Sequence, residues 1–380
     1  MAAFWHDTRL AERNQLGKTL TRLAQSAGAA PIAVEAARGV WFKDDHDMRI
    51  IRTAMGGCEP SGRCLWAGLV VIATLWAAPA IAKLCGDDVG GQDVPCACGD
   101  VLVSSIVLGD DPVVTGPPCP HDGLLVRAPD ARRGLAIDLH GTTLRGTGGG
   151  VGIRVLAGGP GGAQITSSTG PATITGFADG IVARGTDTLA LVQDVVMTDN
   201  HRDGVRVSGP DFTIRRVQVR AAKRDGFVLG GSGFQITDTS AIDSGRYGYL
   251  VMGNTGQIGV AGAGNRAERS GDIGFSIMGA GHTVAECMAV EGHKAGVHLQ
   301  AAQLDVRGCR ATDNAGNGIE GLGNHWQMEG NQALRNIGDG ITVRGVGLVD
   351  AGGNRGVDNQ GQQRARGAVQ CAISGTPCAF

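Results

Sequence analysis

Charged side chains recur at an interval of 22 residues in the second half of the chain, and some of them could carry chemistry. His298 and Glu320 lie 22 residues apart, and an imidazole beside a carboxylate can act as an acid–base pair. Asp203 and Asp225 have the same separation and are further carboxylate candidates for catalysis. They could also help to hold a hard cation, although two carboxylates alone are too few ligands for a Ca²⁺ site. The alternative for the His–Glu pair is a solvated contact between neighbouring repeats.

A second column with the same interval is basic. Its cationic side chains stand two or three positions before a recurring glycine and are flanked by aspartates: Arg202, Lys223, Arg224, Arg246 and Lys294. Such a stripe matches an extended anionic chain such as a uronate polysaccharide. A salt-bridged, solvated edge is the competing interpretation. Aromatic platforms for sugar rings are few, and the candidates are Tyr247, Tyr249 and the pair His325-Trp326.

Composition excludes several classes of protein. The 380 residues include 34 Lys and Arg against 36 Asp and Glu, so the chain lacks the basic footprint of a nucleic-acid binder. Sixty-four glycines are too many for an ordinary helical domain, because an interior glycine costs roughly 0.5–1 kcal/mol relative to alanine. We expect a β architecture dense in turns, with glycine supplying corners of positive φ.

One phrase recurs from residue 150 onward: a turn, then glycine, an apolar residue, any residue and another apolar residue. The glycines are Gly152, Gly180, Gly204, Gly226, Gly248, Gly274, Gly296, Gly318 and Gly340, and five of the eight steps between them have the same length. Self-similarity at a period of about 22 residues indicates a solenoid. Apolar residues alternate in three short runs per period, which predicts an all-β parallel β-helix of about ten coils.

The position four before each repeat glycine is small or asparagine: Asn200, Ala222, Ser244, Ser270, Gly292, Asn314 and Asn336. Recurrence of such residues at one corner predicts an inward polar ladder that satisfies backbone groups of the turns. Ligand binding by these asparagines is the alternative.

The stretch Ile137-Asp-Leu-His-Gly-Thr-Thr-Leu-Arg-Gly146, with Cys98-Gly-Asp100 and Cys119-Pro-His-Asp-Gly123 upstream, resembles the pectate-lyase-like superfamily of right-handed parallel β-helix proteins. The resemblance covers about residues 96–360. It implies the right-handed fold, and Ca²⁺ as a cofactor if the chain is a lyase. Epimerases of the superfamily carry an Asp-Pro-His-Asp phrase. Here Cys119 precedes Pro120-His121-Asp122, so that assignment is not carried over.

Residues 64–82 read as the apolar core and cleavage site of an export signal. We therefore expect a non-native or disordered extension over 1–54, a signal peptide or membrane anchor over 55–82, a disulfide-rich cap over 83–130, the β-helix over 131–365 and a C-terminal cap over 366–380.

Export to the periplasm or the medium would permit disulfides. Cys371 with Cys378 is expected to close the C-terminal end. Cys85, Cys96, Cys98 and Cys119 allow three pairings. Cys287 and Cys309, one repeat apart, are either a disulfide or two stacked thiols.

These features predict a secreted or cell-surface monomer, free of nucleic acid and membrane, that binds an acidic polysaccharide. A polysaccharide lyase or glycoside hydrolase acting on a uronate-containing glycan is one alternative. A structural or adhesion rod is another. The sequence shows no metal site of recognisable spacing and assures no cofactor.

Overall fold

The computed structural model describes residues 82–110, 112–127, 134–186, 188–361 and 370–372. The predicted extension over 1–54, nearly all of the predicted signal peptide and Cys378 lie outside these ranges. Among the residues described, no helix is both long and apolar enough to cross a bilayer.

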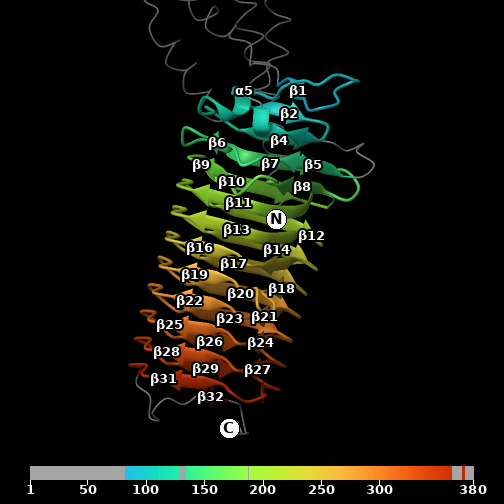
Figure 1. Ribbon diagram of the computed structural model, residues 1–380. Helices are drawn as coiled ribbons and strands as arrows, with labels where there is room; N and C mark the ends of the chain where they lie inside the picture. The colour runs from blue at the N-terminus through green and yellow to red at the C-terminus, as the bar shows by residue number, and fades with distance from the viewer. Residues whose placement is uncertain (1–81, 111, 128–133, 187, 362–369, 373–380) are drawn as a thin grey trace, which may run out of the picture. The chain divides into compact units, whose positions relative to one another are not determined.

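The described unit is a right-handed parallel β-solenoid of about 11 turns, as the repeat and the resemblance predicted. Its strands stack one above another along the axis (Figure 1). The first face is a sheet of 13 parallel strands. They are β1 (Leu84–Cys85), β2 (Asp100–Leu102), β4 (Leu124–Arg127), β7 (Val151–Ala157), β10 (Asp179–Arg184), β12 (Val205–Pro210), β14 (Phe227–Ser232), β17 (Tyr249–Asn254), β20 (Phe275–Ala280), β23 (Val297–Ala302), β26 (Ile319–Leu322), β29 (Ile341–Arg344) and β32 (Gln370–Ala372). Three of these strands, β1, β2 and β4, come from the segment expected to be a cap.

Two further faces close each coil. The second face comprises β3 (Ile106–Val107), β5 (Leu135–Asp138), β8 (Ala163–Thr166), β11 (Leu189–Thr198), β13 (Thr213–Arg220), β15 (Gln235–Thr237), β18 (Gln257–Ile258), β21 (Thr283–Ala285), β24 (Asp305–Arg307), β27 (Gln327–Glu329) and β30 (Val349–Asp350). The third comprises β6 (Thr143–Arg145), β9 (Ala172–Thr175), β16 (Ser240–Ile242), β19 (Arg266–Glu268), β22 (Met288–Val290), β25 (Arg310–Thr312), β28 (Gln332–Leu334) and β31 (Arg355–Val357). Strands β11 and β13 run through the corner and pair on both faces. Two short helical turns, η1 (Leu108–Asp110) and α5 (Pro112–Thr115), precede β4.

The register between coils is maintained even where the repeat length changes. Phe227 pairs with Tyr249, and Tyr249 pairs with Phe275 although the second of these repeats is longer than the first. The extra residues fall between β18 and β19, in the loop that carries the Val260–Ala263 bridge. Each face therefore keeps one side chain above the next along the axis.

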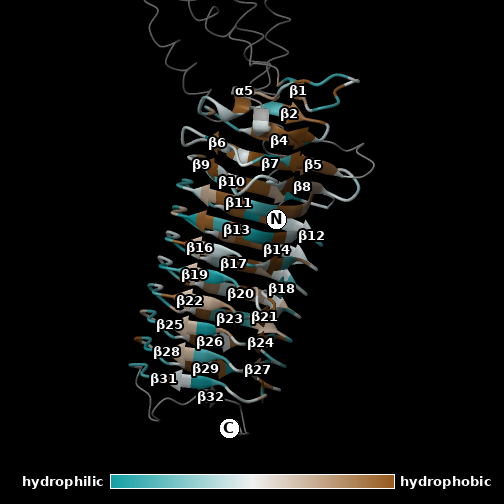
Figure 2. Ribbon diagram, in the orientation of Figure 1, coloured by the Kyte–Doolittle hydropathy of each residue, from teal (hydrophilic) through white to brown (hydrophobic). Residues whose placement is uncertain are grey.

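The core consists of inward residues stacked by this register, and apolar stretches alternate with polar ones along the strands (Figure 2). The rings of Phe227, Tyr249 and Phe275 stack with centroids 4.7 and 4.5 Å apart. Two of the predicted sugar platforms belong to this core, which corrects the prediction. Tyr249 is fully buried because it directly follows a repeat glycine and points inward, and Trp326 is buried with Nε1 donating to the Ala301 carbonyl at 2.8 Å. Tyr247 is half-buried and His325 is exposed.

Glycine supplies corners of positive φ as expected, for example Gly233 and Gly281, both at φ 69°, but the repeat glycines serve a different purpose. A Cβ on Gly226 would lie 2.6 Å from the Gly248 carbonyl oxygen and 2.7 Å from the Ala241 side chain, so this site requires glycine for close packing of the coils. Many corners of positive φ are also formed by residues such as Asp243 and Arg269, at φ 55° and 50°. Aspartate tolerates this conformation better than most side chains.

The predicted polar ladder is confirmed at its asparagine positions. Asn314 and Asn336 are fully buried. The Asn336 Oδ1 accepts from both the backbone N–H and the Nδ2 of Asn314, at 3.0 and 2.9 Å. The Asn314 Nδ2 also donates to the Ala289 carbonyl at 3.3 Å. Each amide thus satisfies backbone groups of two coils, and this is a structural role.

A second asparagine ladder lies at the corner before the third face, and a disulfide interrupts it. Asn331 Oδ1 accepts from the Cys309 N–H at 2.9 Å, while Asn331 Nδ2 donates to the Val306 carbonyl at 2.9 Å. Asn265 makes the same two kinds of bond one repeat before Cys287. Cys287 and Cys309 occupy the two steps between these asparagines and are disulfide-bonded. The N-terminal pairings are Cys85–Cys96 and Cys98–Cys119.

We predict that the Cys287–Cys309 disulfide substitutes for two steps of the ladder. Replacing both cysteines with serine removes the cross-link without supplying long amides, and should lower the free energy of unfolding by about 2–4 kcal/mol. Replacing both with asparagine should restore about 1 kcal/mol or more of that loss, because each amide regains backbone partners. Urea unfolding of the two double variants measures this difference, and equal midpoints would contradict the prediction.

Candidate functional site

Five arginines surround a hollow of about 420 Å³ on the outer side of the first face. The lining includes Leu156, Asp179 and Val182 together with Arg154, Arg184, Arg202, Arg206 and Arg224. We call this hollow the arginine groove. Its lining runs from β7 through β10 and β12 to Arg224, just before β14, so it crosses several successive coils.

The register of the first face places these side chains. Arg154 on β7 and Arg206 on β12 both pair with Val182 on β10, so the three outward side chains form one column. Arg184 lies two residues beyond Val182 and therefore points to the same side of the sheet. Arg202 and Arg224 enter from the corner before the first face.

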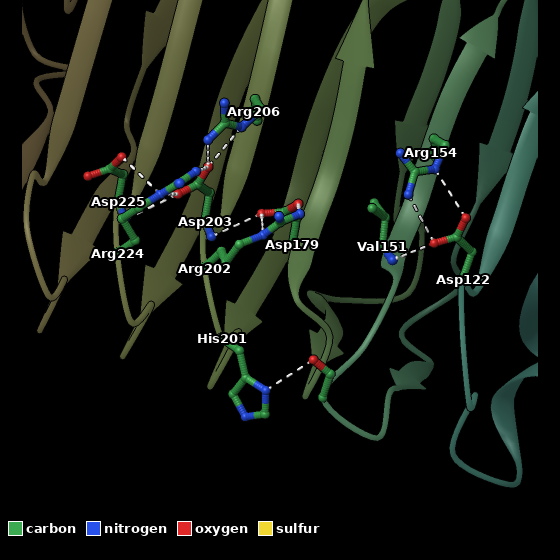
Figure 3. Close-up of polar contacts among 11 residues, drawn as sticks. Asp122, Val151, Arg154, Asp179, His201, Arg202, Asp203, Arg206, Arg224 and Asp225 are labelled. Carbon is green, nitrogen blue, oxygen red and sulfur yellow. Dashed lines mark hydrogen bonds and ion pairs between the residues drawn. The ribbon is translucent and has the colours of Figure 1, made fainter. Parts of the chain in front are cut away.

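Arginine–aspartate pairs link successive coils along this corner (Figure 3). Arg224 donates to both carboxylate oxygens of Asp203, at 2.7 and 2.6 Å, and Arg202 pairs in the same way with Asp179. In the next coil Arg246 donates to Asp225 at 2.8 and 2.6 Å. Each guanidinium reaches the carboxylate of the preceding coil, and this bidentate geometry fixes its orientation.

The groove holds more positive than negative charge. Asp203 is fully buried and is shared by Arg224 and Arg206. Arg154 pairs with Asp122 at 3.1 Å. Arg184 is exposed and has no side-chain partner among the described residues. The carboxylates paired with these arginines are Asp122, Asp179, Asp203 and Asp225, and Asp225 lies 3.6 Å from Arg224 while it also holds Arg246 outside the groove. With Arg246 counted, six guanidinium groups face four carboxylates, which leaves two positive charges in excess.

Burial dominates the electrostatics of Asp203. It raises the pKa of this carboxyl group, Arg224 opposes the shift, and the neighbouring Asp225 and Asp179 add to it. The hydrogen bond to Asp179 raises the pKa of Arg202. The guanidinium groups thus stay charged, and the side chains of Arg202 and Arg224 are 56% and 37% exposed. They can reach an anion in the groove.

The structure brings together only part of the predicted basic stripe. Arg202 and Arg224 line the groove, whereas Lys223, Arg246 and Lys294 do not. Arg246 is held by Asp225 and lies over the Tyr247 ring, and Lys294 is 3.0 Å from Asp272.

Sequence reasoning placed no site at Arg154, Arg184 or Arg206. A signal for Arg154 was present, since Gly152-Ile-Arg154-Val repeats the phrase Gly204-Val-Arg206-Val and puts both arginines in one outward column.

Asp203 and Asp225 are both fully buried behind guanidinium groups. In this arrangement they act as counter-ions, and their oxygens do not fit a Ca²⁺ site because arginines occupy them. Within the described ranges no group of three or more His, Cys, Asp or Glu side chains could hold a metal ion. Ca²⁺ as the cofactor of a lyase remains an untested prediction.

His298 and Glu320 do form a pair, on the outer side of β23 and β26. Nδ1 of His298 lies 2.9 Å from Oε1 of Glu320, and Asn317 Nδ2 donates to the other carboxylate oxygen. The hydrogen bond to Glu320 raises the pKa of His298, and the same bond lowers the pKa of Glu320. Both side chains are about one-third exposed, so the pair is open to solvent.

No family model and no curated protein matches the chain. Among solved structures, it is similar to the A-module of the mannuronan C-5 epimerase AlgE4 from Azotobacter vinelandii, with 14% identity, a TM-score of 0.36, and coverage of 75% of this chain and 87% of that one. It is also similar to the catalytic unit of a thermostable GH87 α-1,3-glucanase from Streptomyces thermodiastaticus strain HF3-3, with 12% identity, a TM-score of 0.29, and coverage of 74% and 70%. Activity has to be argued from the site itself.

We predict that Asp203 stabilises the fold more than an exposed carboxylate in the same geometry does. Asp203→Asn leaves two arginines without their buried counter-ion and should cost about 1–3 kcal/mol of unfolding free energy. Asp313→Asn is the matched control, because Arg335 grips Asp313 at 2.8 and 2.6 Å on the surface. Its cost should stay below about 1 kcal/mol. Equal losses for the two variants in urea unfolding would refute the prediction.

We predict that Glu320→Gln lowers the pKa of His298, measured by NMR titration of the imidazole C–H signals. The pair stabilises the fold where Glu320 is ionised and His298 is protonated. Its contribution to stability should be largest between about pH 4.5, the ordinary pKa of glutamate, and about pH 6.5, the ordinary pKa of histidine. It should fall as the pH drops through the lowered pKa of Glu320 or rises through the raised pKa of His298. An unchanged His298 titration in the variant would show that the pair does not form in solution.

Proposed function

We propose that this chain is an exported parallel β-helix protein that binds an acidic polysaccharide in the arginine groove. The observation that carries the proposal is the excess of two positive charges around a hollow lined by five guanidinium groups, four of which are held by carboxylates. Guanidinium forks bind carboxylates and sulfates through paired hydrogen bonds. The partly exposed arginines keep N–H groups available for such a ligand.

The shape of the groove favours a chain over a small anion. Arg154, Arg206 and Arg224 come from coils that stack at about 4.8 Å per step, so the positive charges repeat along the axis. A polymer with an anionic group on successive units can contact several of them at once. Leu156 and Val182 provide apolar lining between the arginines against which the C–H face of a sugar ring can pack.

Three disulfides support export, because such bonds persist in oxidising compartments. We propose that residues 55–82 direct export and that the product acts in the periplasm or outside the cell, as a monomer. The disulfides and the predicted signal point to the same compartment independently.

A second candidate function is catalysis on such a glycan, as a lyase or hydrolase. The observation in its favour is the solvent-open His298–Glu320 pair. It lies four coils from Arg206 on the same face, about 19 Å along the axis at the usual strand spacing. Incubation with pectate, alginate and glycosaminoglycans, followed by the absorbance of unsaturated uronates, tests the lyase. If there is neither product nor binding to any of these glycans, the structural rod remains.

We predict that Arg184→Gln combined with Arg206→Gln weakens binding to polygalacturonate or alginate by about tenfold or more, since a charge-assisted hydrogen bond contributes about 1.5–3 kcal/mol. Calorimetry or retention on immobilised glycan measures the effect. Binding of the unmodified protein should also weaken as salt rises.

Arg335→Gln is the matched control, because Arg335 is a partly exposed arginine paired with Asp313 outside the groove. It should bind like the unmodified protein. The proposal fails if the double variant binds as well as this control, or if a neutral glucan binds as tightly as the acidic glycans.

A further inference from the structure

Three residues with hydrolytic chemistry lie on successive coils of the first face. Ser276 on β20 pairs in register with His298 on β23, and His298 pairs with Glu320 on β26. All three occupy the outward position two after a repeat glycine, so their side chains project from one side of the sheet in a single column. A serine, a histidine and a carboxylate in that order are the components of a nucleophile with its base and the orienter of that base.

Within this column, His298 and Glu320 are hydrogen-bonded to each other. Glu320 Oε1 holds Nδ1 of His298 at 2.9 Å, and Asn317 holds the second oxygen of Glu320. With Nδ1 engaged, Nε2 is the ring nitrogen left for a proton from another group. The raised pKa of His298 suits a base that must carry the proton between two steps.

Ser276 is the register partner of His298 on the preceding coil, and no hydrogen bond joins the two side chains. Ser276 is 5% exposed, and its hydroxyl makes no hydrogen bond to any described side chain or backbone group. Leu250 is its register partner on the preceding coil, and Met278 lies two residues further along β20, so both project on the same side of the sheet as Ser276. Contacts between a nucleophile and its base are often long in unliganded sites and tighten when substrate binds.

A lysine occupies the corner that follows Ser276 by one coil. In the arginine groove, Arg224 reaches back to the preceding coil, where it and Arg206 share Asp203. Three repeats further along, Lys294 occupies the position equivalent to Arg224, and Ser276 the position equivalent to Arg206. The Lys294 side chain is two-thirds exposed and its ammonium is 3.0 Å from Asp272, while Ile273 stands where the groove has Asp203. We therefore do not assign Lys294 as an oxyanion donor.

We propose that Ser276, His298 and Glu320 form a serine esterase site that hydrolyses small carboxylic esters, such as O-acyl groups on a glycan. The Ser276 oxygen attacks the ester carbonyl carbon while His298 Nε2 takes the hydroxyl proton. The C–O bond of the ester then breaks, and the alcohol leaves with that proton. Water attacks the acyl-serine, His298 takes its proton, and the carboxylic acid leaves as Ser276 recovers its hydrogen. Leu250 and Met278 provide an apolar surface for the acyl group.

The site is tested on the full chain with p-nitrophenyl acetate and with a fluorophosphonate label located by mass spectrometry. We expect label on Ser276 and ester hydrolysis that falls at least about a hundredfold in Ser276→Ala and in His298→Gln. Ser276→Ala should fold normally, because Val228 and Leu250 occupy the same outward position in other coils. Thermal unfolding checks this.

Glu320 acts as a positioning residue, so its variant needs a readout other than loss of rate. In Glu320→Gln the rising limb of the pH–rate profile should move to lower pH, because His298 loses the partner that raises its pKa. Ser168→Ala is the matched control, since Ser168 also lies beside a histidine, 3.1 Å from His140 Nδ1, without a carboxylate on that ring. It should keep full activity.

The proposal is overturned if the protein neither hydrolyses the ester nor takes the label, if the label is found on another serine, or if Ser276→Ala retains the activity. The arginine groove is a separate site. Arg335→Gln, which lies outside both sites, should leave hydrolysis of p-nitrophenyl acetate unchanged. Glycan retention is measured separately from this hydrolysis, so failure of glycan binding and failure of the esterase are distinguishable.

Discussion

Parallel pairing between coils requires each strand to align with the strand one turn before it, and every column of side chains in the molecule is a consequence of that register. A shift of one residue along a strand would move its inward side chains to the outside. Among the described strand pairs the register shifts at two places, between Leu189 and Leu191 and between Val126 and Arg127. The pairing of Tyr249 with Phe275 across a longer repeat shows the strength of this constraint. The surplus residues leave the strands and form a loop, and the stacked rings remain in contact.

The same constraint turns local chemistry into linear arrays. Asparagines on successive coils, such as Asn314 and Asn336, form a ladder, and arginines with aspartates on successive coils form a row of ion pairs between coils. Burial of Asp203 beneath Arg206 and Arg224 has two effects. It orients the guanidinium groups toward the outer side of the sheet, and it neutralises only part of their charge. An array of this kind suits a ligand that is itself periodic.

The fold could be predicted from the sequence because its signals are repeated many times, as in Gly204, Gly226 and Gly248. The site could be predicted only in part. Arg202 and Arg224 were found through their spacing, but the partner of each arginine depends on how far its side chain reaches across the corner. Tyr249 was wrongly predicted to be a surface platform for a sugar ring, because it lies at an inward position of its strand. The pairing of the four N-terminal cysteines could not be predicted, because it depends on the geometry of the loops and the spacing of the cysteines does not determine that geometry.

The central claim is that the arginine groove, in which Asp179 and Asp203 hold Arg202, Arg206 and Arg224, forms the binding site for an acidic glycan. A crystal structure with a short acidic oligosaccharide, such as an oligogalacturonate, tests it most directly. The account predicts anionic groups of the ligand against Arg154, Arg184 and Arg206, with the Arg224–Asp203 pair still formed. A ligand bound on another face, or one whose anionic groups point away from these arginines, would contradict it.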